Sequence, residues 1–520
     1  MKKLLFVILS VILISGLVLS GCTTQTATTT TTLAAGTPKY GGTFKIADAI
    51  GPRTSIGWIA DPVGFLGGPF SNIFMDTILE SDVNGVIKPC LATKFDVSSD
   101  LKTITLTLRQ GVKFHDGSDW NATAAKWNID QLIAAKIGDY INVSSVDMVD
   151  TYTVKLNVST YTNTLLNSIA STYIVSKAAY DTHGANKDAI EWMRWNPVGT
   201  GPFKFVSYTP NVVIKGIKNT DYWQKGKPYV DAIEYNIIGD QMTRAQSLQA
   251  GEMDAIGGDL SKVEYDLQQK GFQIVKGYIS TGGLVPDSKN ADSPLSNLKV
   301  RQAIDYAIDR AAICTTLGYG FWAPTEQFAV PGTTSWITSL PTNNYNVDKA
   351  KQLLTEAGYA NGFKITLYGS VAITSKDFAT AVQGYLSKIG ITLDVNLMDH
   401  ASYTDLSLKG WKNGFAAGAK SVDGNMNYAL NLAWTQTTPY HPSMDKPDAF
   451  QALYNTAAAA KTFDPALTQK AIKYMYDNEM YIPVYCNSRG QVMQTYVHDT
   501  GFYTFHNWAS WRPSDVWLNK

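Results

Sequence analysis

The chain has 520 residues, in which 44 lysines and arginines balance 44 aspartates and glutamates. The length predicts two or more domains, and the balanced charge leaves no overall positive field for a phosphate backbone, so nucleic acid is not an expected partner. Charged residues make up 17% and aromatic residues 12% of the chain, a composition that suits a large core and surfaces made for stacking and hydrogen bonding.

The first residues predict export from the cytoplasm. Lys2 and Lys3 precede an apolar run over 4–19 that is short for a membrane span. The run leads into Leu-Ser-Gly-Cys at 19–22, which resembles the lipobox of bacterial lipoproteins. This resemblance implies a signal peptide over 1–21 that is removed, and lipidation of Cys22. The alternative interpretation of the run is an uncleaved membrane anchor.

A threonine-rich segment over 22–39 follows. It lacks apolar periodicity and cannot bury enough surface to offset its ordering entropy, so we predict a tether. Two or three lipid chains on Cys22 would hold the body at the extracytoplasmic face of the cell membrane, in the periplasm or at the cell surface. No second long apolar run occurs in the sequence from residue 40 onward.

The first half of the body mixes strands and helices. Alternating apolar residues predict strands over 41–47, 103–108, 154–158 and 233–237. Helices are predicted through 124–132, with Asn121 or Thr123 as the capping residue, and over 242–250. Glycine and proline mark a break in the pattern at 199–205 and a loop that begins at 219.

The second half alternates helices and strands more regularly. Residues 284–297 contain two prolines and several polar residues, and are the predicted crossing between lobes. One amphipathic helix is expected over 300–312, with Arg301, Asp305 and Arg310 on its outer face. Further helices are expected over 348–357 and 378–386, with strands over 363–367 and 391–397. This order indicates an α/β fold, and no fixed-period repeat interrupts it.

Several segments together resemble the family 5 extracellular solute-binding proteins of peptide, dipeptide and nickel importers. The matching segments follow the order of that family and cover the chain from Tyr40 onward: 41–47, 111–117, 199–205, 222–228, 300–310, 348–358 and 481–485. The resemblance implies a two-lobed periplasmic-binding-protein clamp of type II, with three subdomains, mixed sheets and a hinged cleft. We expect lobe one over 40–285 plus 480–520, and lobe two over 286–479.

The resemblance also suggests ligand-binding residues. In peptide-binding relatives an acidic residue of the second lobe meets the α-amino group of the ligand, and Asp423 occupies the corresponding position. The family commonly has Trp three residues earlier, where this chain has Lys420, which would suit a carboxylate or phosphate on the ligand. Alternatively, Asp423 belongs to a simple turn and Lys420 is solvated. Possible aromatic walls are Trp336, Trp411, Trp434 and Tyr485.

The predicted function is capture of a peptide or another small polar solute and its delivery to an ABC transporter permease. An oligosaccharide, a nickel complex or an anionic metabolite is the alternative ligand. The partners expected from this are the solute, the permease and the membrane through the N-terminal lipid, with a monomeric chain and no cofactor. A secreted hydrolase with a catalytic carboxylate pair is the competing class.

Sequence motifs give little support for an enzyme. The chain has no HExxH, GxSxG or P-loop pattern, and its six histidines show no metal-ligand spacing. His115 and Asp116 are neighbours in a predicted structural turn, and no catalytic residue is proposed. Cys90, Cys314 and Cys486 are either buried free thiols or one disulfide plus one thiol.

Overall fold

The computed structural model describes residues 36–61, 69–505 and 508–520. The predicted signal peptide and the lipidation of Cys22 lie outside the described residues, as does most of the predicted tether. Residues Pro38–Lys520 form one compact unit. No helix in the described part of the chain combines the length and apolar character that a bilayer crossing needs.

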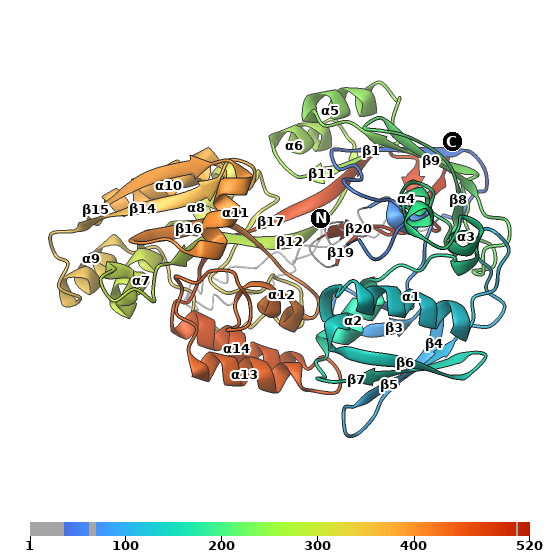
Figure 1. Ribbon diagram of the computed structural model, residues 1–520. Helices are drawn as coiled ribbons and strands as arrows, with labels where there is room; N and C mark the ends of the chain where they lie inside the picture. The colour runs from blue at the N-terminus through green and yellow to red at the C-terminus, as the bar shows by residue number, and fades with distance from the viewer. Residues whose placement is uncertain (1–35, 62–68, 506–507) are drawn as a thin grey trace, which may run out of the picture. The chain divides into compact units, whose positions relative to one another are not determined.

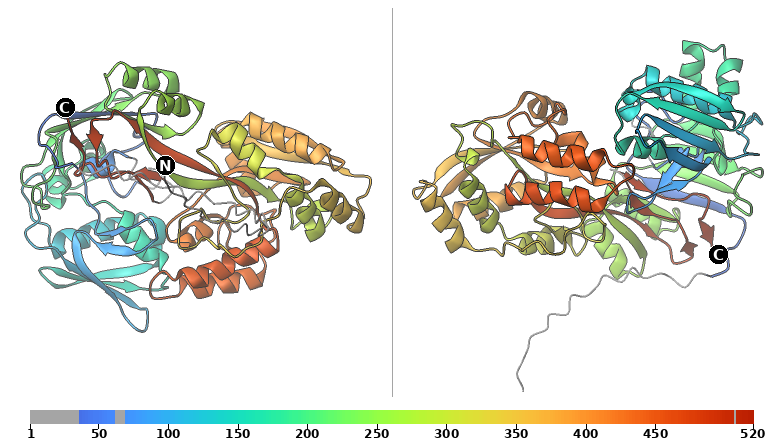
Figure 2. Two further views of the ribbon diagram at one scale, coloured as in Figure 1. Left: turned by 180° about the vertical axis from the view of Figure 1, so that it is seen from behind. Right: turned by 90° about the horizontal axis from the view of Figure 1, so that it is seen from below.

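A mixed sheet runs through the centre of this unit (Figure 1). Its long antiparallel pair is β12 (Gln273–Pro286) and β17 (Ile482–Met493), which lie alongside each other in both views of Figure 2. β12 and β17 each continue the sheet on one side. Beyond β17 come β11 (Ala255–Asp259), β1 (Thr43–Asp48), β10 (Ala232–Ile237), β9 (Val213–Lys218) and β8 (Phe203–Thr209). Beyond β12 come β16 (Gly414–Ser421), β14 (Phe363–Ser370) and β15 (Ile391–Met398), and the short β13 (Ala323–Pro324) pairs with β17.

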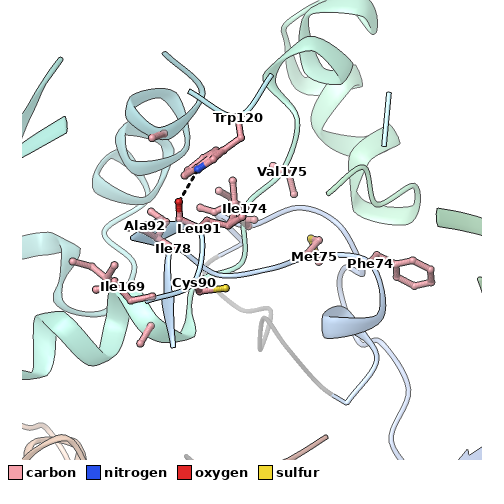
Figure 3. Close-up of a cluster of buried hydrophobic side chains, with 14 of the residues drawn as sticks. Phe74, Met75, Ile78, Cys90, Leu91, Ala92, Trp120, Ile169, Ile174 and Val175 are labelled. Carbon is pink, nitrogen blue, oxygen red and sulfur yellow. Dashed lines mark hydrogen bonds between the residues drawn. The ribbon is translucent and has the colours of Figure 1, made fainter. Parts of the chain in front are cut away.

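A second sheet has the order β4 (Ala92–Val97), β5 (Thr103–Leu108), β7 (Thr153–Val158), β6 (Val143–Asp150). The predicted strands over 103–108 and 154–158 are confirmed, because alternating residues of β5 face the core. α1 (Ala122–Ala134) begins at Asn121, whose side chain accepts a hydrogen bond from the backbone N–H of Ala124 (3.1 Å). Figure 3 shows the adjoining core, where Trp120 Nε1 donates to the carbonyl of Leu91 (3.0 Å).

The remaining elements of the first half surround these sheets. α2 (Thr164–Ser171) packs near the small hairpin of β2 (Leu79–Ser81) and β3 (Ile87–Pro89). The others are the 3-10 turns Ser71–Ile73 and Gly138–Asn142, α3 (Lys177–Thr182), α4 (Lys187–Trp195), α5 (Gln241–Gln249) and α6 (Lys262–Gln269). At the C-terminus β18 (Val497–His498) pairs with β21 (Trp517–Leu518), and β19 (Tyr503–Phe505) with β20 (Trp508–Ser510).

Asp76 holds two of the family-like segments together in the first half. Its partly buried carboxylate accepts hydrogen bonds from Thr200 Oγ1 (2.9 Å), Tyr222 Oη (3.1 Å) and Trp223 Nε1 (2.8 Å). Burial raises the pKa of Asp76 to about 6, although these three donors oppose the rise. The glycine-rich break at 199–205 and the Tyr-Trp pair at 222–223 are therefore joined through one side chain.

The helices of the second half form two groups. One group packs with β14, β15 and β16 around an apolar core: α7 (Leu298–Ala307), α8 (Arg310–Gly318), α9 (Val347–Glu356) and α10 (Lys376–Ser387). The other group packs on the opposite face of the sheet and consists of α12 (Met426–Ala433), α13 (Asp448–Ala458) and α14 (Pro465–Asp477). α13 and α14 lie side by side in Figure 2. α11 (His400–Lys409) and the 3-10 turn Pro294–Ser296 complete this half.

The single helix predicted over 300–312 is wrong. The chain is extended at Ile308 (φ −99°, ψ 116°), and Asp309 starts a new helix by accepting a hydrogen bond from the N–H of Ala312 (2.9 Å). An aspartate favours the cap position over a helix interior because its side chain competes for backbone donors.

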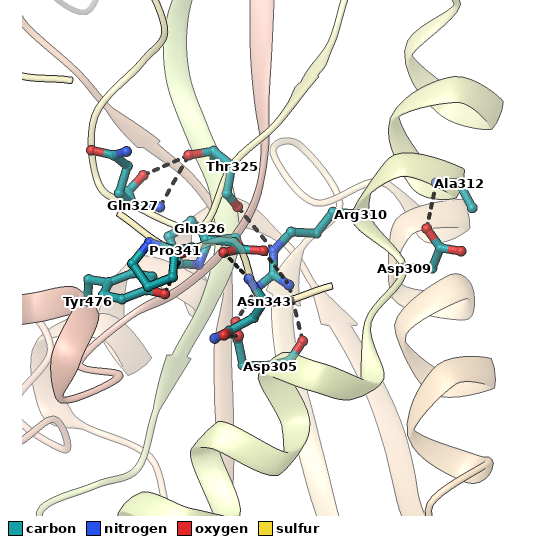
Figure 4. Close-up of polar contacts among 11 residues, drawn as sticks. Asp305, Asp309, Arg310, Ala312, Thr325, Glu326, Gln327, Pro341, Asn343 and Tyr476 are labelled. Carbon is teal, nitrogen blue, oxygen red and sulfur yellow. Dashed lines mark hydrogen bonds and ion pairs between the residues drawn. The ribbon is translucent and has the colours of Figure 1, made fainter. Parts of the chain in front are cut away.

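The outward placement of Arg301, Asp305 and Arg310 is also wrong, since all three are buried. Figure 4 shows Arg310 paired with Asp305, and its Nε donates to the carbonyls of Thr325 (3.1 Å) and Pro483 (2.9 Å). These partners come from distant parts of the chain, so the helical pattern alone does not reveal them.

The described cysteines are three buried free thiols, Cys90, Cys314 and Cys486. Of the two alternatives, the structure therefore has free thiols and no disulfide among these three. Burial raises the pKa of Cys314 to about 12, and burial raises the pKa of the other two thiols as well. These thiols are protonated at neutral pH and contribute as small apolar groups.

Candidate functional site

Lys420 lies near the end of β16, directly opposite Thr281 of β12. Paired residues of antiparallel strands project to the same face of the sheet. Ala416 of β16 and Val285 of β12, which share this face by the alternation of the strands, pack in the core that contains α12, α13 and α14. Lys420 is partly buried and Thr281 is fully buried.

Within the described part of the chain, the ammonium of Lys420 contacts an imidazole and no carboxylate. Lys420 Nζ lies 2.9 Å from His441 Nε2, and His441 Nδ1 lies 3.1 Å from the carbonyl oxygen of Ala433. Since a carbonyl only accepts, we assign the proton of His441 to Nδ1, and Nε2 then accepts from Lys420. Burial lowers the pKa of Lys420 to about 8. Burial, and next the charge of Lys420, hold the pKa of His441 well below its usual range.

Aromatic rings enclose His441. The ring centroid of Trp434 lies 5.4 Å from that of His441, and Trp411 meets His441 edge-on at 6.0 Å. Trp434 is fully buried and also packs on Tyr481 (4.9 Å) and Phe328 (5.0 Å). Trp411 Nε1 donates to the carbonyl of Gly414 (3.2 Å), whereas Trp434 Nε1 has no hydrogen-bond partner among the described residues. Two of the predicted aromatic residues are thus grouped with Lys420 through His441.

Asp423 lies three residues further along the chain, in a buried asparagine cluster. Its Oδ1 accepts from the backbone N–H of Asn425 (2.8 Å) and from Asn167 Nδ2 (3.3 Å) of α2. Asn425 Nδ2 donates to Asn167 Oδ1 (2.9 Å) and to Asn163 Oδ1 (3.2 Å). Asn427 Nδ2 adds a hydrogen bond to Asn163 Oδ1 (3.3 Å). These amides connect the start of α2 with the start of α12.

The β2–β3 turn supports the same contact. Gly85 has a positive φ of 75°, and a Cβ there would lie 2.6 Å from both the carbonyl carbon of Gly424 and the nitrogen of Asn425. Glycine is therefore required for both its conformation and its close approach. Residues 82–86 and 163–167 together cover the segment that contains Asp423.

Tyr485 and Trp336 are not brought into this group. The Tyr485 ring lies against Gly282, stacks on Trp322 at 4.2 Å and packs in the core of α7 to α10. Trp336 is half-buried beside the core of α12 to α14, and its carbonyl accepts from Gln469 Nε2 (3.3 Å). Their ligand-binding roles stay predictions.

The sequence did not single out His441, Thr281, Asn163 or Asn167. His441 lies 21 positions from Lys420, with no spacing that links the two residues. The asparagines at the start of α12 have partners at the start of α2 that lie more than 250 positions away, so no local pattern links them.

His115 and Asp116 belong to a structural turn, as predicted. His115 Nε2 contacts the carbonyl of Gly201 (3.0 Å), and Asp116 accepts from Ser176 Oγ (2.5 Å) and Ser118 Oγ (2.6 Å). The two side chains therefore have separate partners. Burial lowers the pKa of His115 to about 4, so it is neutral at physiological pH.

Comparison with known proteins identifies the family. The sequence profile of bacterial extracellular solute-binding proteins, family 5, matches residues 86–449. The chain belongs to this family. Its members of established function include the glutathione-binding protein GsiB of Salmonella paratyphi A, which is 30% identical over 468 residues, covering 82% of this chain and 87% of that protein. Members of the family serve ABC importers, and solute binding for import is the function of this chain.

Solved structures share the fold. HbpA2 from Haemophilus parasuis superposes with a TM-score of 0.79 at 23% identity, covering 92% of this chain and 100% of that one. DppA from Helicobacter pylori, in complex with the peptide STSA, has a TM-score of 0.70 at 24% identity and covers 93% and 99%. The predicted two-lobed binding-protein clamp is confirmed by these neighbours. The family is extracytoplasmic, and its relatives are transport proteins rather than enzymes.

Proposed function

We propose that this chain is a lipid-anchored, monomeric binding protein that captures a peptide or another small polar solute between two lobes and delivers it to an ABC permease. Lobe one comprises 40–285 and 480–520, and lobe two comprises 286–479. β12 and β17 connect the lobes, since β12 pairs with β16 of lobe two and β17 of lobe one, and β17 pairs with β11 of lobe one and β13 of lobe two. The chain acts without a cofactor or metal and has no catalytic residue.

The observation that carries this proposal is the asparagine cluster. Asn163 and Asn167 belong to lobe one in this assignment, and Asp423, Asn425 and Asn427 to lobe two, so their hydrogen bonds join the two lobes. Hydrogen bonds of this kind are made only when the lobes are closed. A ligand that touches both lobes favours the closed form, and population shift then converts binding into a signal for the permease.

The ligand-binding residues that we propose divide by charge. Asp423 binds the α-amino group of a peptide, because a carboxylate oxygen accepts more than one hydrogen bond. Lys420 binds a negatively charged group of the ligand, and Trp411 and Trp434 form the wall around His441. Trp336 and Tyr485 remain part of the proposal as more distant walls. Relatives named for glutathione and a relative solved with a peptide support a peptide-like solute.

Membrane attachment follows from the sequence. Removal of residues 1–21 leaves Cys22 as the lipidated N-terminus, and residues 22–39 act as the tether between the membrane and the body. Labelling with a radioactive or clickable fatty acid in a bacterial host tests this step. Replacement of Cys22 by Ala should abolish labelling and release the protein from the membrane fraction.

Native mass spectrometry of the gently purified protein tests the binding function. We expect a bound small molecule, or uptake of members of a tripeptide to pentapeptide mixture, with a matching rise in the melting temperature. Separate mixtures of oligosaccharides and nickel chelates distinguish the alternative ligands. Absence of binding to every class would overturn the proposed function.

A further inference from the structure

Lys420 differs from the other buried basic side chains in its environment. Arg489 pairs with Asp48 (2.7 Å) and Arg310 pairs with Asp305. Arg301 donates to four backbone carbonyls and Arg244 to two. Among the described residues, the polar partner of Lys420 Nζ is one imidazole nitrogen, and no carboxylate lies within ion-pair distance. Removing a cation partly from water raises the free energy of the folded protein unless a nearby anion balances its charge.

His441 cannot supply that negative charge. It is neutral, and its Nε2 occupies only one of the three N–H donors of the ammonium. Its Nδ1 is fixed by the carbonyl of Ala433, which orients the ring toward Lys420. His441 therefore positions the ammonium and leaves two of its donors for another group.

Two further polar side chains adjoin this pair, one on the strand residue opposite Lys420 and one packed against His441. Thr281 Oγ1, on the residue paired with Lys420 across the strands, has no hydrogen-bond partner among the residues described, and neither does Trp434 Nε1. Both side chains are completely buried. Trp434 adjoins the same imidazole, with ring centroids 5.4 Å apart. A buried polar group without a partner is rare in a folded protein, and two such groups belong to side chains that neighbour Lys420 or its partner His441.

We propose that Lys420, Thr281 and Trp434 form a subsite for a carboxylate of the transported solute, with His441 as the positioning residue. This inference rests on the proposed function and narrows it to solutes that carry a free carboxylate. One ammonium balances the single charge of a carboxylate. A phosphate dianion would leave an excess negative charge in the enclosed site, so the carboxylate is the better match.

Charge coupling gives the subsite a pH signature. Burial already lowers the pKa of Lys420 to about 8, so deprotonation removes the charge above that pH. A bound carboxylate favours the charged form of Lys420. The affinity of an N-acetylated acid peptide is therefore constant between about pH 5 and pH 8 and declines at higher pH. The titratable or charged groups packed around this face are His441 and Lys446 in the segment after α12, Asp423 after β16, Tyr403 of α11, and Tyr481 and Cys486 at β17.

The test compares two peptide mixtures on the full-length mature protein, one with free C-termini and one with C-terminal amides. Calorimetry and thermal shift should show binding of the free acids, with the amides at least tenfold weaker. The Lys420→Met variant should bind the free acids at least tenfold more weakly than the wild type does. Its affinity for the amides should be unchanged. A C-terminally amidated phosphoserine peptide mixture serves as the phosphate arm and should bind no better than the plain amides.

Stability separates this subsite from a structural role. Ligand-free Lys420→Met should melt at a higher temperature than the wild type, because an unbalanced cation is removed, and yet show a smaller shift with acid peptides. Thr281→Val, which keeps the shape of the side chain, should weaken acid binding alone and serves if Lys420→Met fails to fold. With N-acetylated acid peptides, which have no α-amino group to titrate, Lys420→Arg should retain acid binding and lose the decline above pH 8.

The outcomes distinguish the two proposals. Equal affinity for acids and amides, or unchanged acid binding in both Lys420→Met and Thr281→Val, overturns the carboxylate subsite and leaves the binding function intact. Preferential binding of the phosphopeptides replaces the carboxylate by a phosphate and overturns the inference as stated. If the wild type binds neither peptide mixture, no glutathione, no sugar and no nickel chelate, the proposed function fails and the subsite fails with it.

Discussion

Asn167 donates its side-chain amide to Asp423 across 256 positions of the chain, with 3.3 Å between Nδ2 and Oδ1. The oxygen of the same Asn167 amide accepts a hydrogen bond from Asn425 Nδ2 (2.9 Å). One side chain therefore bonds to both a carboxylate and a neighbouring amide. This buried contact requires one relative placement of the two segments. If the segments separated, Asn167 and Asp423 would lose each other as hydrogen-bond partners.

Replacement of Asn167 by Ala should therefore weaken ligand binding without touching the ligand. Loss of its two buried hydrogen bonds costs the closed form about 1–3 kcal/mol, which corresponds to a decrease in affinity of roughly 5-fold to 150-fold. Calorimetry with a ligand found by native mass spectrometry measures this change. Asn396→Ala is the matched control, since Asn396 is exposed on β15. Wild-type affinity in Asn167→Ala would show that the contact has no role in closure.

Asp423 should recognise the α-amino group of a peptide. A cation about 4 Å from a carboxylate gains about 4 kcal/mol at an effective dielectric constant near 20, before the desolvation cost is subtracted. We expect Asp423→Asn, which still accepts hydrogen bonds from Asn167 and Asn425, to bind free-amine peptides about 10-fold to 100-fold more weakly. N-acetylated peptides lack the charge and are the control ligand. An equal loss for both peptide types would assign Asp423 a purely structural role.

The partly buried carboxyl of Asp76 should make the free energy of unfolding depend on pH. Its folded-state pKa is raised to about 6 from 3.8, so its contribution to stability is complete below about pH 4 and is lost as the pH rises through 6. Between pH 7 and pH 5 the wild type should gain about 1 kcal/mol relative to Asp76→Asn. Urea unfolding at pH 5, 6 and 7 measures the difference. Asp130→Asn, an exposed carboxylate beside Lys126, should leave the pH dependence unchanged.

The sequence predicts those elements whose backbone conformation depends on neighbouring residues. The alternating residues of β5 indicate its strand because successive side chains of a strand face opposite sides. The break between α7 and α8 was missed, since the apolar spacing continues across Ile308 while the cap at Asp309 decides the backbone. The fold class followed from the order of several segments, each of which is weak alone.

The candidate site was only partly predictable. The resemblance to the family pattern indicates Lys420 and Asp423, but His441 reaches Lys420 only because the segment after α12 returns to the sheet. Thr281 looks like any strand threonine until its unsatisfied hydroxyl is seen opposite Lys420. Contacts of this kind depend on tertiary placement, for which a single sequence carries no periodic signal.

The Asp305–Arg310 pair should be essential for the stability of the second half. Arg310 is buried and also contacts backbone carbonyls, so Asp305→Ala leaves a charge enclosed without its main counter-ion (Figure 4). Removal of one partner of a buried ion pair costs about 3–5 kcal/mol, and we expect a clear decrease in melting temperature. The exposed pair Lys364–Asp394 (2.8 Å) offers the control, because Asp394→Ala should cost at most about 1 kcal/mol. Similar melting temperatures for the two variants would contradict a stabilising role for the buried pair.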